Sequence, residues 1–513
     1  MFVNAMSRQS LTASAQDSYA GALATGLLGA VVTALPVVFH LAGQPIAIAL
    51  CVLLSVILTG VATASIPIAL VISYLFQNLF VALVSPQITG IEQLNSIRAY
   101  NFVTTASVWL VLTAGYWLER RTIERRMRLT IDVTTAALVL IGAYFALGVV
   151  SAPENAATYL RNIAAPFLLF QIFALVAYRH PVRFIKPLTI VAAIAVAYGF
   201  FELLAQKELF RLVNGDVYIN WRVRQEFDSG VWLRDLQETG RVMRSYLDTL
   251  AIEFLNTPLL RDSGIQLYRL VGPNFHSISF AYALVFFAVL LAAAGRWWWP
   301  ILVLPPTIVI GSKGALVTFV LVLTFLVLIR WLLTFRHLAW YLFTLATYAI
   351  AGVVVGIRAG DYHVIGFIGG LRGFLANPLG RGIGAGGNLS LNVSSYDWSR
   401  SQQLGHTDVA LESAVGVLLY QMGVAGLVVL GVLFWIVLTL WRHYRLTGQS
   451  LYAAAALGIA AITVNGIFQE EALFAPLALG MMCAFGGLML GTAYRAAPAR
   501  VVMRPLLRPA VAS

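Results

Sequence analysis

The chain has 513 residues, of which 60% are hydrophobic and only 11% are charged, and its formal net charge is +12. Soluble domains carry about 25% charged residues, so a chain this apolar is an integral membrane protein with many spans. This composition excludes a soluble enzyme and a disulfide-rich secreted scaffold. An outer-membrane β-barrel is also excluded, because the apolar runs are continuous and do not alternate.

The sequence predicts an all-α polytopic membrane protein with about 12–14 transmembrane helices. A helix needs about 20 apolar residues to cross a bilayer, and most of the apolar segments approach that length. The segment 298–311 is short and contains Pro305-Pro306, which predicts a broken or tilted helix. In chain order the segments are 21–41, 46–64, 66–85, 101–118, 131–150, 164–178, 184–205, 275–294, 298–311, 313–334, 338–357, 413–441, 451–468 and 472–493.

These segments divide the chain into seven regions. They are an N-terminal tail (1–20), a first group of transmembrane helices (21–205), a loop (206–274), a second group (275–357), a larger loop (358–412), a last group (413–493) and a basic tail (494–513). Within the first loop, near-helical spacing of apolar residues from about Val231 to Phe254 predicts an amphipathic helix at the membrane interface. Function is expected in the two loops, because the short connections leave little room for a site.

The basic residues indicate the orientation of the chain. With the spans above, the basic connections and both termini fall on one side, which the positive-inside rule assigns to the cytoplasm. These connections contain 119–128, Arg179, Arg183, Lys186, Arg330, Arg336, Arg442, Arg445 and the arginines of the tail. The charge of +12 is therefore largely a topology signal, and no nucleic acid partner is expected. Both loops fall on the opposite side.

The usual motifs of several enzyme classes are absent from the sequence. There is no His-Glu-x-x-His, no Walker A sequence, no Asp-x-Asp and no Gly-x-Ser-x-Gly. Cys51 and Cys483 lie inside apolar runs, so neither a disulfide framework nor a cysteine metal site is expected. The sequence predicts chemistry without a metal and without a cofactor.

The stretch from Gly369 to Asn388 is rich in glycine and contains Arg372 and Arg381. Guanidinium groups bind phosphate oxygens in a bidentate manner, and glycines allow backbone N–H groups to approach an anion. An anion site is therefore one interpretation of this stretch. A flexible loop with solvated charges is the other.

The order of several motifs resembles the O-antigen ligase and O-antigen polymerase superfamily of bacterial envelope glycosyltransferases. Arg372 and Pro378-Leu-Gly-Arg-Gly-Ile-Gly384 are similar to the family's late loop, and Glu412 to Gly426 is similar to the span that follows it. Arg269-Leu-Val-Gly-Pro-Asn-Phe-His276 and Gly311-Ser-Lys-Gly-Ala315 are similar to two earlier span entries. The resemblance covers roughly residues 265–430.

The resemblance implies a fold like that of the GT-C type glycosyltransferases in the bacterial inner membrane. The donor is a glycan on undecaprenyl diphosphate, the acceptor is a sugar hydroxyl, and other polysaccharide-assembly proteins are partners. Arg372, Arg381, Arg269 and Lys313 are then candidates to hold the diphosphate, with His276 near them. Glu412 or His406 is the candidate general base. Glu412 stands where the family often has histidine, and Lys313 replaces an arginine.

Each candidate also has a structural explanation. Lys313 could snorkel to the interface, Arg269 could anchor its loop, and His406 could be solvated. Glu412 could stabilise a helix N-terminus, and Glu470-Glu471 could mark a turn between spans.

Three functions remain open from the sequence: a polymerase of lipid-linked repeat units, a ligase that transfers glycan to another acceptor such as lipid A-core, and a transporter or flippase of lipid-linked glycans. A transporter would carry charges in the middle of its spans, whereas here they gather towards one face, which favours catalysis.

Overall fold

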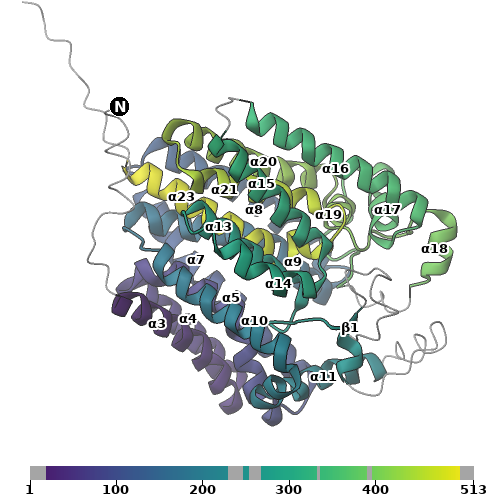
Figure 1. Ribbon diagram of the computed structural model, residues 1–513, viewed down its shortest axis with the longest axis horizontal. Helices are drawn as coiled ribbons and strands as arrows, with labels where there is room; N and C mark the ends of the chain where they lie inside the picture. The colour runs from purple at the N-terminus through teal and green to yellow at the C-terminus, as the bar shows by residue number, and fades with distance from the viewer. Residues whose placement is uncertain (1–18, 229–245, 253–266, 332–335, 390–395, 497–513) are drawn as a thin grey trace, which may run out of the picture.

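The computed structural model describes residues 19–228, 246–252, 267–331, 336–389 and 396–496, most of which are helical (Figure 1). Ten of the described helices are long and apolar enough to cross a membrane. By the length and composition of its helices the chain is an all-α multi-pass membrane protein, as predicted. The strands within the described residues are the two-residue pair β1 (Ala251–Ile252) and β2 (Leu267–Tyr268), which is antiparallel.

The first half of the chain contains nine α-helices, most of them long and two of them shorter. They are α3 (Tyr19–Phe39), α4 (Gln44–Val61), α5 (Ile66–Val84), α6 (Ile91–Arg98), α7 (Tyr100–Glu119), α8 (Arg125–Val149), α9 (Pro153–Arg179), α10 (Ile185–Val213) and α11 (Gly215–Asp228). Short 3₁₀ turns lie at η1 (His40–Ala42), η2 (Thr63–Ser65), η3 (Ser85–Gln87) and η4 (Tyr246–Leu250).

The second half contains the helices that carry most of the motifs. They are α13 (Ser277–Ala293), α14 (Trp299–Ile310), α15 (Lys313–Trp331), α16 (His337–Ala359), α17 (Tyr362–Ala376), α18 (Trp398–Leu404), α19 (Ala414–Met422), α20 (Val424–Thr447), α21 (Ser450–Asn465), α22 (Glu470–Phe474) and α23 (Met481–Ala496), with a π turn, η8 (Pro476–Gly480), before the last.

Helices α9 and α23 pack along each other in the centre of the bundle, with α7, α8 and α21 beside them. A Cβ atom added to Gly487 or Gly491 of α23 would lie 2.1 or 2.2 Å from the backbone oxygens of Phe170 and Ala174 on α9. Small residues spaced four apart let two membrane helices approach closely. These glycines therefore set the contact on which the bundle is built.

The connections between helices separate into two ends of the bundle. At the terminal end, where α3 begins and α23 ends, Arg179 pairs with Glu119 and Arg330 lies over the ring of Trp297. Each contact joins two connections between helices that the order of the spans places on the same side of the membrane. The loop end carries residues 360–389 and 396–412, with α11, α17 and α18 on the right of Figure 1.

Several predicted segments differ from the observed helices, and 472–493, for example, is divided among α22, η8 and α23. The segment 164–178 is part of the longer helix α9, which begins at Pro153. The segment 413–441 is two helices, because Gly423 between α19 and α20 has a φ of 56°. The segment 298–311 is one short continuous helix, α14, which contains both prolines.

The two predicted loops contain more helix than expected. α10 continues beyond residue 205, with a kink at Ala205, and α11 follows it. The larger loop contains α17 and α18. Most of the predicted amphipathic helix from Val231 to Phe254 lies outside the described residues, and the described part forms η4 and β1.

Candidate functional site

A histidine–carboxylate pair lies at the loop end. The side chain of Asp361 caps α17 by accepting hydrogen bonds from the backbone N–H groups of His363 and Val364, which fixes His363 in the first helical turn. The Nδ1 atom of His363 lies 3.2 Å from Oε2 of Glu412 and 3.3 Å from its backbone oxygen. The two side chains are 41% and 28% exposed, so the pair is open to a substrate.

The pair shifts the pKa of each partner. Burial alone lowers the pKa of His363, but the hydrogen bond and charge of Glu412 outweigh it and raise this pKa above 6.5. Burial alone raises the pKa of Glu412, but the hydrogen bond and charge of His363 outweigh it and lower this pKa below 4.5. Glu412 therefore stays ionised near neutral pH, and His363 is the group that gains and loses a proton.

The backbone of Glu412 has an unusual conformation, with a φ of 60°. This left-handed region costs a residue other than glycine about 1–3 kcal/mol unless its surroundings hold it. The side-chain oxygen of Asn388 accepts a hydrogen bond from the Glu412 N–H at 3.0 Å. Ser413, the next residue, caps α19 by accepting from the N–H of Gly416. Glu412 is thus held from both sides and presents its carboxylate to His363.

A buried carboxyl group lies beneath Asn388. Glu470 is 4% exposed, and its two oxygens accept hydrogen bonds from the Tyr159 hydroxyl at 2.5 Å and from the Asn388 N–H at 2.9 Å. The Tyr159 hydroxyl also accepts from the N–H of Leu389. Burial raises the pKa of Glu470 to about 8. This group connects α9 and α22 to the residue that holds Glu412.

The glycine-rich stretch packs against α19 and α9 through backbone and side-chain contacts. The N–H groups of Arg381 and Gly382 donate to the backbone oxygen of Gln421, and the Gln421 side chain donates to the oxygen of Gly386. A Cβ atom at Gly387, where φ is 102°, would lie 1.9 Å from the Tyr159 hydroxyl. Most N–H groups of this stretch donate to protein oxygens, so few are left to approach an anion.

A second structural unit presents Arg269. It follows β2, and its N–H donates to the oxygen of Leu250. The next two N–H groups, of Val271 and Gly272, donate to the fully buried carboxylate of Glu202 at 2.7 and 2.8 Å. The Nε atom of Arg269 is buried without a hydrogen-bond partner, and burial lowers the pKa of this guanidinium. The turn therefore holds a guanidinium group whose buried Nε–H has no acceptor among the described residues.

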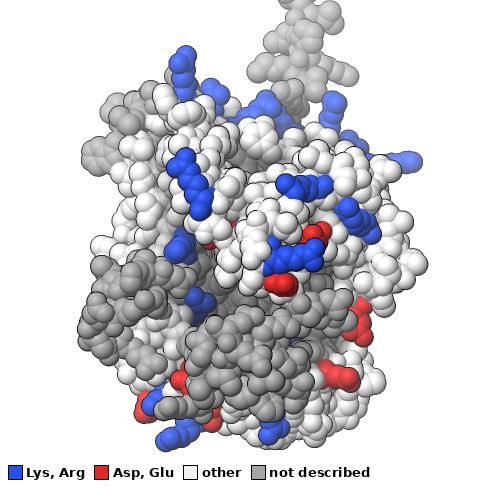
Figure 2. Space-filling view, turned by 90° about the vertical axis from the view of Figure 1, so that its right-hand side faces the viewer, with Lys and Arg blue, Asp and Glu red and all other residues white. Residues whose placement is uncertain are grey.

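Glu471 connects this turn electrostatically with the histidine pair. Burial raises its pKa, the charge of Glu412 raises it further, and the charges of His363 and Arg269 oppose this rise. The charges of Arg269, His363 and Glu412, which are far apart in the sequence, therefore all act on the buried carboxyl of Glu471. Figure 2 shows this end of the molecule, where basic side chains gather with acidic ones among them.

Three other predicted residues have different environments. Arg372 is exposed on α17 and forms no hydrogen bond or ion pair within the described residues. Nine residues separate it from His363, so it lies on the opposite face of that helix. Arg381 packs over the ring of Tyr420, 4.1 Å from its centroid, and donates to the oxygen of Gly373. Lys313 is exposed at the start of α15.

The two predicted histidines are not joined to Glu412. His276 caps α13, and its Nδ1 accepts from the N–H of Ser279. His406 lies in the loop after α18, where its Nδ1 contacts the backbone oxygen of Thr407, and no hydrogen bond within the described residues links it to Glu412.

The sequence reasoning missed His363, Asn388, Tyr159 and Glu202. A capping signal was present for His363, because Asp361 precedes it by two residues at the start of an apolar helix. The other three act through contacts between distant segments, and no local signal marks them.

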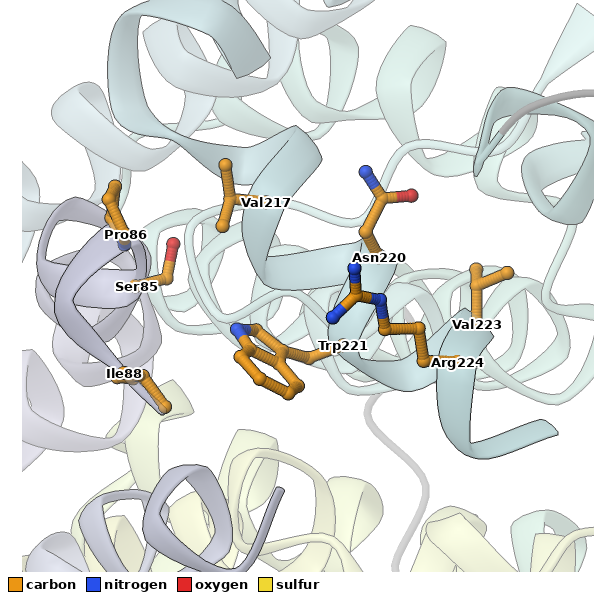
Figure 3. Close-up of a pocket in the computed structure, with 8 residues that line it drawn as sticks. All are labelled: Ser85, Pro86, Ile88, Val217, Asn220, Trp221, Val223 and Arg224. Carbon is orange, nitrogen blue, oxygen red and sulfur yellow. The ribbon is translucent and has the colours of Figure 1, made fainter. Parts of the chain in front are cut away.

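A cavity of about 400 Å³ lies between η3 and α11, and it shares no lining residue with the His363–Glu412 pair (Figure 3). It is formed by η3, Ile88 and α11, and Arg224 lies over the ring of Trp221, 5.5 Å from its centroid. An apolar lining with a few polar groups such as Asn220 is typical of a small-molecule site.

Within the described residues there is no group of three or more His, Cys, Asp or Glu side chains that could hold a metal ion. No family model, no curated protein and no solved structure matches the chain.

Proposed function

We propose that the protein is a metal-independent glycosyltransferase that polymerises glycan repeat units carried on a polyprenyl diphosphate. The observation that supports this best is the open His363–Glu412 pair, whose charges act together with that of Arg269 on the buried carboxyl of Glu471. It combines a proton acceptor with a cation at the same end of a membrane bundle. If the terminal end faces the cytoplasm, as the positive-inside rule predicts, the reaction takes place at the periplasmic face.

In this proposal His363 is the general base. Its Nδ1 is directed at Glu412, so Nε2 is the nitrogen that takes the proton of the acceptor hydroxyl. The hydroxyl oxygen forms a bond to the anomeric carbon of the donor, and the bond from that carbon to the diphosphate breaks. The ionised carboxylate of Glu412 orients the ring and stabilises the imidazolium that forms. Arg269 stabilises the charge of the departing diphosphate.

Reconstituted protein tests this proposal directly. Liposomes would receive undecaprenyl-diphosphate-linked oligosaccharide and EDTA without any nucleotide, and the products would be separated by size. We expect a ladder of repeat units and release of undecaprenyl diphosphate. Single transfer to an added lipid A-core acceptor, without a ladder, would indicate a ligase. Movement of intact donor across the bilayer, without release of carrier, would contradict the proposal and indicate a transporter.

A further inference from the structure

One face of α11 forms a wall of the cavity that lies between this helix and η3. Side chains three or four residues apart lie on the same face of a helix. The members of this face that line the cavity are Val217, Asn220, Trp221 and Arg224. Figure 3 shows the indole of Trp221 directed towards η3, with the Arg224 guanidinium and the Asn220 amide on one side of it. The cavity wall therefore carries hydrogen-bonding groups next to an aromatic ring.

Contacts within the protein hold both walls of this cavity in place. Asn214, just before α11, donates from its amide to a backbone oxygen at the end of α5 at 3.0 Å. Its own backbone oxygen accepts from the hydroxyl of Ser85 in η3 at 3.3 Å. Tyr218 packs on Phe275, with the ring centroids 4.7 Å apart, and Phe275 lies in the turn that follows Arg269. The cavity is therefore pre-formed, and α11 connects it to the turn of Arg269.

The ring of Trp221 positions the Arg224 side chain. The guanidinium carbon lies 5.5 Å from the centroid of the indole, within the range of a cation–π interaction. A guanidinium uses its face for such a contact and its N–H groups for hydrogen bonds. Arg224 forms no hydrogen bond or ion pair with another described residue. Its donors are therefore available to a ligand at the cavity.

The lining of the cavity restricts the class of ligand. A cationic ligand would need a carboxylate, and the described residues of the lining include none; the single cation, Arg224, does not balance a diphosphate. Asn220 and Ser85 each carry a donor and an acceptor, whereas Arg224 and the indole N–H only donate. The remaining lining residues are apolar. A ligand with several hydroxyl groups and with apolar C–H surface matches both parts of this lining.

We propose that this cavity binds a sugar unit, with Arg224 and Asn220 on its hydroxyl groups and Trp221 beside them. A sugar ring carries hydroxyl groups around its edge and C–H groups on its faces, and neighbouring hydroxyls suit the paired N–H groups of a guanidinium. The volume of about 400 Å³ is within the range of small-molecule sites. The sugar site itself does not depend on the proposed function. That the bound sugar belongs to the glycan, held apart from its reacting end, rests on that function.

Binding of methyl glycosides to the full-length protein in phosphatidylcholine nanodiscs tests the site. The probes are the methyl glycosides of glucose, galactose, N-acetylglucosamine and glucuronic acid, and the readout is the Kd from saturation-transfer NMR titrations. We expect at least one to bind. Trp221→Ala should weaken it about tenfold or more, because the variant loses the ring and releases Arg224. Asn220→Ala should weaken it about 2- to 13-fold, the effect of a lost hydrogen bond. Arg358→Gln, an exposed arginine outside the cavity, is the charge-matched control for Arg224→Gln and should bind like the wild type.

Two results would overturn the sugar site. One is the absence of binding by all four glycosides. The other is an unchanged Kd in folded Trp221→Ala or, if that variant does not fold, in both Trp221→Phe and Arg224→Gln. Binding by a wild type that transfers no glycan would support the site and contradict the proposed function. Glycan transfer by a wild type that binds none of the four glycosides would do the reverse.

Discussion

The substitution Asn388→Ala separates the side-chain contact of this residue from its backbone contact. The variant keeps the N–H that donates to Glu470 and loses only the oxygen that accepts from the Glu412 N–H at 3.0 Å. A net hydrogen bond contributes about 0.5–1.5 kcal/mol. The left-handed backbone of Glu412 stores about 1–3 kcal/mol that this bond helps to offset.

Loss of this bond favours rearrangement of Glu412 by about 0.5–1.5 kcal/mol, which corresponds to about a 2- to 13-fold lower kcat. KM for the donor should change little, because the cation at Arg269 is untouched. The assay is glycan transfer by the purified variant, with its thermal unfolding measured alongside. Gln403→Ala, at an exposed position in the same loop, is the control. Wild-type kcat in a normally folded Asn388→Ala would refute the reasoning that Asn388 holds Glu412 in place.

Three further predictions concern stability and binding. Because Glu470 has a pKa of about 8, the native chain keeps a proton that the unfolded chain loses above about 4.5. Thermal stability should therefore fall as pH rises from about 4.5 to about 8, and Glu470→Gln should flatten this part of the profile; an unchanged slope would contradict the assignment. Gly387→Ala should lower the unfolding temperature more than Gly405→Ala, because both have positive φ but only Gly387 lacks space for a Cβ atom, and equal effects would contradict this packing. Arg269→Ala should raise the donor KM about tenfold or more, whereas Arg372→Ala should have a smaller effect, and the opposite order would move the diphosphate to α17.

The helices were largely predictable, because a membrane helix must satisfy its own backbone and so appears as a long apolar run. The start of α9 was not predictable in this way. Glu154, Arg161 and Asn162 interrupt the apolar run, although the helix continues through them. The break at Gly423 was also missed, because hydropathy does not report a positive φ.

The candidate site was predictable only in part. Glu412 and Arg269 were singled out by the family resemblance, and the charges of both act on the buried carboxyl of Glu471. The pairing of Glu412 with His363 joins segments 49 residues apart, and no local pattern shows it. The glycines near Asn388 looked like an anion-binding loop, because glycines that allow close packing and glycines that expose N–H groups look alike in a sequence.

The central claim is that His363 takes the proton of the acceptor hydroxyl. The most direct measurement is single-turnover transfer from the lipid-linked donor by His363→Ala, across pH and with and without added imidazole. General-base catalysis is worth about 10²–10⁴ in rate, so the variant should lose this factor and imidazole should restore part of it. The wild-type rate should rise with pH through the raised pKa of His363, as the ring loses its proton. A wild-type rate and pH profile in folded His363→Ala would contradict the claim.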